Sequence, residues 1–90
     1  MPESSEAAIT LAGDLHARPA GSLALAAAGF ASTVELAVGG TRVDAKSVLS
    51  IMGLGATTGK QVFVRATGPD ASEAVAAIIG ILARATPVGG

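Results

Sequence analysis

The sequence contains no cysteine, tryptophan, tyrosine or asparagine, and only two phenylalanines and one histidine. Without cysteine the chain can form neither a disulfide nor a thiolate metal site, so it needs no oxidising compartment. A formal charge of −1 and the shortage of aromatic residues argue against binding to nucleic acid. No apolar run approaches the ~18 residues of a membrane span, and residues 1–6 lack the basic and apolar regions of a signal peptide. We therefore expect a soluble cytoplasmic protein that binds no nucleic acid and inserts into no membrane.

The spacing of apolar residues predicts seven secondary-structure elements in the 90 residues. Alternating apolar residues are typical of strands, and apolar residues at helical spacing are typical of helices packed on a core. These patterns predict strands over 7–11, 33–38, 41–44 and 61–66, and helices over 17–28, 47–52 and 70–84. The predicted order is β-α-β-β-α-β-α. We expect a single domain over residues 1–90, in which residues 1–5 are a loose leader and residues 86–90 a loose tail. Because the apolar stripes need a shared partner, we expect an α+β fold in which helices cover one face of an antiparallel sheet.

Three local signals mark the ends of these elements. Gly39-Gly40 predicts a tight hairpin turn between the second and third strands. Gly29 predicts the end of the first long helix. Asp70 followed by Glu73 predicts a capping box at the start of the last helix.

The single histidine, His16, lies in the segment Asp14-Leu15-His16-Ala17-Arg18-Pro19-Ala20. Proline favours the first turn of a helix, so Pro19 places His16 at or just before a helix N-terminus. Unpaired N–H groups and the positive end of the helix dipole attract anions there. The guanidinium of Arg18 suits phosphate oxygens. Arg18 could be an ordinary solvated charge, but a cation at this end of a helix opposes the dipole and makes better sense if an anion binds there. The pattern indicates a histidine that accepts a phosphoryl group, whose oxygens Arg18 and the N–H groups near Ala17 hold.

A second segment, Ala45-Lys46-Ser47-Val48-Leu49-Ser50-Ile51-Met52-Gly53-Leu54-Gly55, follows downstream. Together with Leu15–Ala20 and with the order and spacing of the elements, it resembles the histidine-containing phosphocarrier protein (HPr) family of the bacterial sugar phosphotransferase system. The resemblance runs from about Ala7 to Ala83. It implies an open-faced β-sandwich, with a four-stranded antiparallel sheet and three helices on one face.

The resemblance also implies a function. His16 would be phosphorylated on Nδ1 by enzyme I, which takes the group from phosphoenolpyruvate, and would pass it to the A component (enzyme IIA) of a sugar permease. Such a protein is a phosphocarrier and a substrate of enzymes rather than an enzyme. We expect a monomer with no cofactor and, given one histidine and no clustered carboxylates, no metal site.

Ser47 has two compatible interpretations. Serine is a preferred capping residue, so Ser47 could cap the short helix that follows. By the resemblance it also matches the site that a dedicated HPr kinase phosphorylates in some bacteria. The same resemblance places an apolar docking patch for partner proteins beside His16, made of Val48, Leu49 and Met52. The neighbouring Ile51 and Leu54 are expected in the core.

The chain departs from the family at Asp14, where glycine is usual. One explanation is conformational, because aspartate tolerates left-handed or turn geometry better than most residues. The other is electrostatic: the carboxylate repels an arriving phosphate, and so slows phosphorylation or shifts it to higher pH. Most lysines that the family often carries around the patch are also absent here, which leaves Arg18, Lys46 and Lys60 and weakens steering toward acidic partners.

Two other functions are compatible with the sequence. A regulatory paralogue of the family would bind a transcription factor or enzyme according to its phosphorylation state, and a His16→Ala variant could keep its output. A small α+β ligand-binding module would gain no phosphate when mixed with phosphoenolpyruvate and enzyme I.

Overall fold

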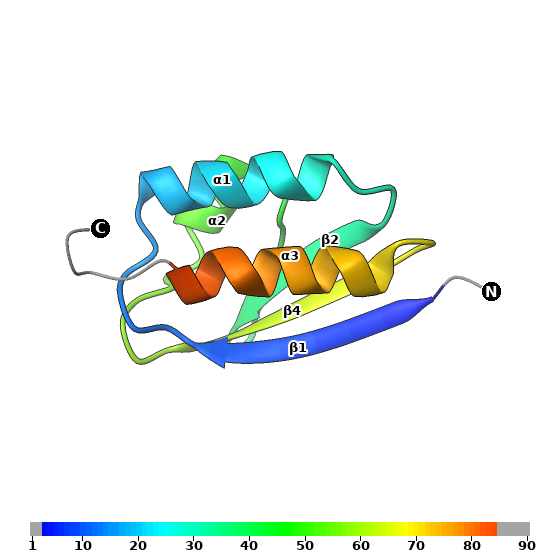
Figure 1. The fold of residues 1–90 in the computed structure, drawn as a ribbon. Helices are drawn as coiled ribbons and strands as arrows, with labels where there is room; N and C mark the ends of the chain where they lie inside the picture. Colours follow the sequence, from blue (N-terminus) through cyan, green and yellow to red (C-terminus); the bar gives the residue numbers. More distant parts are fainter. Residues whose placement is uncertain (1–2, 85–90) are drawn as a thin grey trace.

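The computed structural model describes residues 3–84, which form seven elements in the predicted order (Figure 1). Each element is of the type that its apolar pattern predicts. Their bounds are β1 Ser4–Thr10, α1 Ala17–Ala28, β2 Thr33–Val38, β3 Thr41–Asp44, α2 Val48–Met52, β4 Gln61–Thr67 and α3 Ala71–Arg84.

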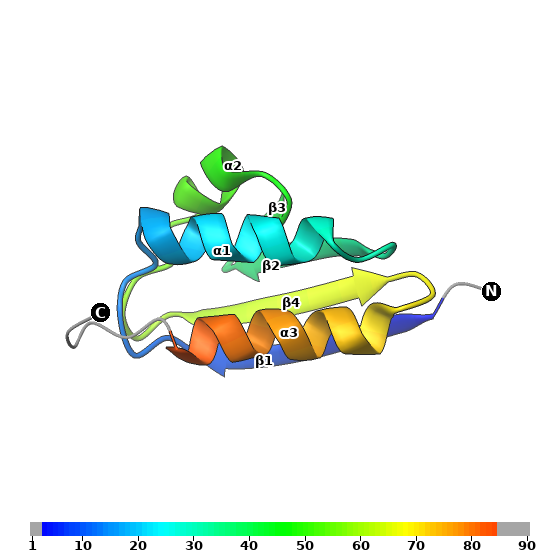
Figure 2. The same cartoon turned by 45° about the horizontal axis from the view of Figure 1, so that its top comes forward.

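The four strands form one antiparallel sheet in the order β1-β4-β2-β3. The hairpin between β2 and β3 turns at Gly39-Gly40, where Gly39 has a φ of +59°, a left-handed conformation that favours glycine. The long helices α1 and α3 lie side by side over one face of the sheet (Figure 2). The short α2 packs against α1 and β3, above the N-terminal half of α1 and away from α3. The architecture is the expected open-faced α+β sandwich.

The hydrophobic core lies between the sheet and the two long helices. Alternate side chains of the central strands point into it, because successive strand residues face opposite sides. The helices contribute residues at helical spacing, as predicted, although Ile79 of α3 is only partly buried. The largest fully buried side chains are Leu23, Val34, Leu36, Ile51, Val62, Val64, Ile78 and Leu82.

The first strand begins earlier than the sequence predicts. β1 starts at Ser4, inside the segment 1–5 that was expected to be a loose leader. Ser4 is paired with Thr67, and the N–H of Gly68 donates to the carbonyl of Glu3 at 2.8 Å. The polar pair Ser4-Ser5 carries no apolar alternation, so only the length of the partner strand β4 explains this extension. The predicted tail, 86–90, lies outside the described residues.

The start of α3 is also held differently from the prediction. The carboxylate of Asp70 accepts hydrogen bonds from the N–H groups of Ala31 and Ser32, at 2.9 Å each, and from the Ser32 hydroxyl. These bonds stabilise the ionised form and lower the pKa of Asp70. The side chain therefore ties α3 to the loop before β2 rather than forming the predicted capping box with Glu73.

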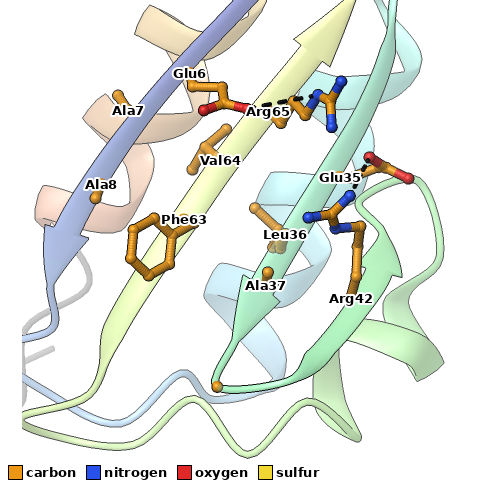
Figure 3. A pocket seen from close by; sticks show the side chains of 11 residues that line it. Glu6, Ala7, Ala8, Glu35, Leu36, Ala37, Arg42, Phe63, Val64 and Arg65 are labelled. Atoms are coloured by element: carbon orange, nitrogen blue, oxygen red, sulfur yellow. Dashed lines mark ion pairs between the residues drawn. The ribbon is translucent and has the colours of Figure 1, made fainter.

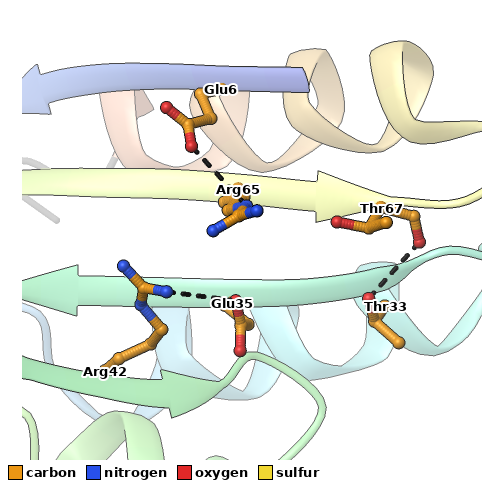
Figure 4. A network of polar contacts seen from close by, with 6 residues as sticks. All are labelled: Glu6, Thr33, Glu35, Arg42, Arg65 and Thr67. Atoms are coloured by element: carbon orange, nitrogen blue, oxygen red, sulfur yellow. Dashed lines mark hydrogen bonds and ion pairs between the residues drawn. The ribbon is translucent and has the colours of Figure 1, made fainter. Parts of the chain in front are cut away.

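The second face of the sheet is open within residues 3–84. Two ion pairs join neighbouring strands there, Arg65 Nε to Glu6 Oε2 at 3.6 Å and Arg42 Nη1 to Glu35 Oε1 at 3.9 Å (Figure 4). With the half-exposed Phe63, these side chains border a hollow of about 420 Å³ (Figure 3). No lining residue belongs to 14–20 or to α2, so this hollow is separate from the His16 region.

Candidate functional site

His16 is the N-cap residue of α1, as Pro19 predicts. Its backbone is extended, with φ −84° and ψ 179°, and its side chain makes no capping hydrogen bond to the helix. The preceding Leu15 is buried and its N–H donates to the carbonyl of Ala56 at 2.9 Å, whereas His16 itself is exposed. Leu15 thus anchors the segment in the core and leaves the imidazole accessible to another protein.

The first turn of α1 supplies the groups that can hold an anion. Ala17 and Arg18 are both exposed, and the turn contains no acidic residue. The N–H groups of a first helical turn have no carbonyl partner inside the helix, and Pro19 contributes none. The first N–H bonded back along the chain is that of Ala20, which donates to the carbonyl of His16 at 3.0 Å. A negatively charged group at this end of α1 would therefore face unpaired backbone N–H groups and the positive end of the helix dipole.

Asp14 forms hydrogen bonds that neither the conformational nor the electrostatic explanation of this residue predicts. Among residues 3–84 only glycines adopt a positive φ, so Asp14 is not a substitute for a left-handed glycine. Its Oδ1 atom instead accepts two hydrogen bonds from Thr58, one from the N–H and one from the hydroxyl, each at 2.8 Å. These bonds lower the pKa of Asp14, with a smaller contribution from the nearby His16. No local signal links two residues 44 positions apart, so Thr58 could not be found from the sequence.

The connection between Asp14 and Thr58 belongs to a wider contact between two loops. The N–H of Leu11 donates to the carbonyl of Lys60, and the N–H of Gly59 donates to the carbonyl of Leu11, both at 2.9 Å. The segment from β1 to α1 therefore runs beside the segment from α2 to β4.

Ser47 caps α2, as one of its two interpretations predicts: its hydroxyl oxygen accepts the N–H of Ser50 at 3.2 Å. Val48, Leu49 and Met52 are exposed by 40%, 86% and 45%. Ile51 and Leu54 are buried, as expected. Because α2 lies above the N-terminal half of α1, the three exposed apolar side chains lie on an element that neighbours the His16 end of that helix (Figure 2).

Between residues 3 and 84, no three histidine, cysteine or acidic side chains are grouped so that they could hold a metal ion. None of the helices in that range has the length and apolarity needed to cross a membrane.

Comparison with known proteins gives a consistent result. The family model described as "PTS HPr component phosphorylation site" matches residues 3–84. The phosphocarrier protein HPr of Cupriavidus necator is 39% identical over 69 residues, which are 77% of this chain and 78% of that protein. The crystal structure of a phosphocarrier protein HPr from Bacillus anthracis has a TM-score of 0.77 at 30% identity, covering 90% of this chain and 96% of the other. The crystal structure of HPr from Thermoanaerobacter tengcongensis has a TM-score of 0.76 at 32% identity, covering 89% of this chain and 90% of the other. The chain therefore belongs to the HPr family, the phosphocarrier proteins of the phosphotransferase system.

Proposed function

We propose that this phosphocarrier receives a phosphoryl group on His16 from phosphorylated enzyme I and passes it to the enzyme IIA component of a sugar permease. The observation that carries the proposal is the placement of an exposed imidazole at the N-cap of α1. The protein acts as a monomer in the cytoplasm, without cofactor or metal. It is the carrier in the reaction, and the two larger partners are the catalysts.

The transfer needs few groups from the carrier itself. A lone pair on Nδ1 of His16 attacks phosphorus while the bond from phosphorus to the donor on enzyme I breaks. A nucleophile on enzyme IIA then attacks the same phosphorus, and the bond from phosphorus to Nδ1 breaks. Transfer of this kind depends mainly on positioning and on neutralising the phosphoryl oxygens. Arg18 and the N–H groups of Ala17 and Arg18 supply that positive charge at the start of α1.

The partners dock on the apolar patch Val48, Leu49 and Met52. These side chains are exposed on a helix whose own core contact is made by Ile51, so part of their apolar surface is available to a partner. Ser47, at the start of the same helix, is a candidate site for an HPr kinase. A phosphate there would add close to two negative charges beside the patch and so weaken or redirect docking.

The test is the intact mass of the protein after incubation with phosphoenolpyruvate and a cognate enzyme I. The wild type gains the mass of one phosphoryl group, in an acid-labile and base-stable linkage, and Ser47→Ala gains it equally. His16→Ala gains nothing. An unchanged mass of the wild type, or an equal gain by His16→Ala, would refute the proposal.

A further inference from the structure

The segment that presents His16 is fastened on its N-terminal side by two sets of hydrogen bonds. One is the backbone bond from Leu15 to the carbonyl of Ala56, at 2.9 Å. The other is the pair of bonds that Thr58 donates to Asp14 Oδ1, at 2.8 Å each. The side-chain connection joins the exposed Asp14, two residues before His16, to the exposed Thr58 of the other loop. It is therefore placed to set the direction in which the imidazole leaves the extended backbone of His16.

We propose that Asp14 is a positioning residue for the phosphorylation of His16, acting through its two hydrogen bonds from Thr58. This inference rests on the proposed function and adds to it a residue pair that presents the acceptor. Asp14 does not touch the phosphoryl group. It holds the backbone of His16 extended, so that the ring stands beside the first turn of α1.

The charge of Asp14 gives the competing expectation. An aspartate carboxylate is already ionised at neutral pH, and the hydrogen bonds from Thr58 lower the pKa of Asp14 further. The carboxylate also lies near enough to His16 for the two to interact. A negative charge there would repel an arriving phosphoryl group. Because Oδ1 already accepts two donors from Thr58, however, the charge is partly compensated and held against the other loop.

Four variants separate positioning from charge. Asp14→Asn removes the charge but keeps a carbonyl oxygen that can accept the two hydrogen bonds from Thr58. Asp14→Ala removes the charge and the acceptor together. Thr58→Val loses the hydroxyl donor and keeps the N–H, and Thr58→Ser keeps both donors. If positioning dominates, Asp14→Asn and Thr58→Ser keep the wild-type phosphorylation rate, whereas Asp14→Ala and Thr58→Val are phosphorylated more slowly. If repulsion dominates, both Asp14 variants are phosphorylated faster than the wild type.

The measurement is kcat and KM for phosphorylation by phosphorylated enzyme I, from pH 6 to 8. A misdirected acceptor lowers kcat more than it raises KM, because docking lies elsewhere. We expect kcat to fall about tenfold in Asp14→Ala and about threefold in Thr58→Val, and to stay within about twofold of the wild type in the other two. When Asp14→Ala and Thr58→Val are combined, the loss of kcat should be smaller than the product of the two single losses, since both changes break the same connection. Wild-type kcat in Asp14→Ala, or a faster rate in both Asp14 variants, would overturn the inference.

Two matched variants control for general effects. Glu6→Ala removes an exposed carboxylate on the open face of the sheet, and Thr33→Val removes an exposed hydroxyl that donates to Thr67 at 3.3 Å. Thr33 follows the C-terminal end of α1, at the other end of the helix from His16. Both should leave kcat and KM unchanged. If they lower kcat as much as Asp14→Ala does, the effect is not specific to the connection between Asp14 and Thr58.

Hydrogen exchange tests the connection without any partner protein. The amide of Leu15 lies directly beside Asp14 in the chain, so its exchange should become faster in Asp14→Ala and remain near the wild-type rate in Asp14→Asn. If the wild type takes up no phosphate but this exchange pattern is found, the proposed function fails and the structural part of the inference stands. If phosphate is taken up but the variants exchange alike, the positioning inference fails alone.

Discussion

Gly68, between β4 and α3, is a position at which one added methyl group should destabilise the fold. Its φ of +146° lies in a region that residues with a side chain rarely adopt. A Cβ atom there would lie 2.6 Å from Ser32 Oγ and 2.7 Å from Ser32 Cα. Ser32 is completely buried, and a backbone atom cannot rotate away as a side chain can. In Gly68→Ala the backbone of one loop or the other must therefore move.

The cost of Gly68→Ala has two parts. Holding a residue with a side chain in this backbone region costs about 1–3 kcal/mol. Making room in a closely packed site costs about 1–3 kcal/mol more. We therefore expect the free energy of unfolding to fall by about 4 kcal/mol, a large part of the roughly 5–13 kcal/mol typical of a domain of this size. The melting temperature should fall by about 15–30 °C.

The assay is urea unfolding followed by far-ultraviolet circular dichroism, because the chain has neither tryptophan nor tyrosine for fluorescence. Gly80→Ala is the matched control, since Gly80 lies inside α3 and a Cβ there would meet only Arg84 Nη1 at an ordinary 3.6 Å. That variant should be more stable than the wild type by about 1 kcal/mol. A Gly68→Ala protein within about 0.5 kcal/mol of the wild type, the range of ordinary surface changes, would refute the reasoning.

Three further predictions concern the core, the docking patch and acid stability. Ile78→Ala empties a fully buried site and should lower the free energy of unfolding by about 3 kcal/mol in urea. Leu49→Ala removes a side chain that is 86% exposed, so stability should change by less than about 0.5 kcal/mol while the KM for phosphorylation by enzyme I rises. The pKa of Asp70 is lower in the folded state than in the unfolded state, so its contribution to stability is present above about pH 4 and is lost as the pH falls further. An acid titration of Asp70→Asn, followed by circular dichroism, should therefore show a flatter loss of stability below that pH.

Each of these predictions has a contrary outcome. Equal stability of Ile78→Ala and the wild type would mean that the core relaxes around the cavity. An unchanged KM for Leu49→Ala would show that Leu49 does not belong to the proposed docking patch. Parallel acid titration curves for Asp70→Asn and the wild type would show that the Asp70 hydrogen bonds do not set the acid limit.

Much of the fold is determined by short-range features of the sequence. Apolar periods of two and 3.6 residues place the strands and helices, because a side chain's direction depends on its own neighbours along the chain. Pro19 is enough to locate His16 at a helix start, and Gly39-Gly40 to locate the hairpin. The proposed acceptor His16, its cationic neighbour Arg18 and the cap at Ser47 could all be identified in this way.

Only the tertiary structure decided which distant groups meet. The sheet order puts β4 between β1 and β2, and this pairing begins β1 at Ser4, where the local pattern is silent. Asp70 looks like an ordinary helix cap in the sequence, yet it binds the loop before β2. Asp14 likewise finds Thr58 across 44 residues. A carboxylate takes whichever donors the folded backbone brings within hydrogen-bonding distance, and that choice is not encoded in the residues beside it.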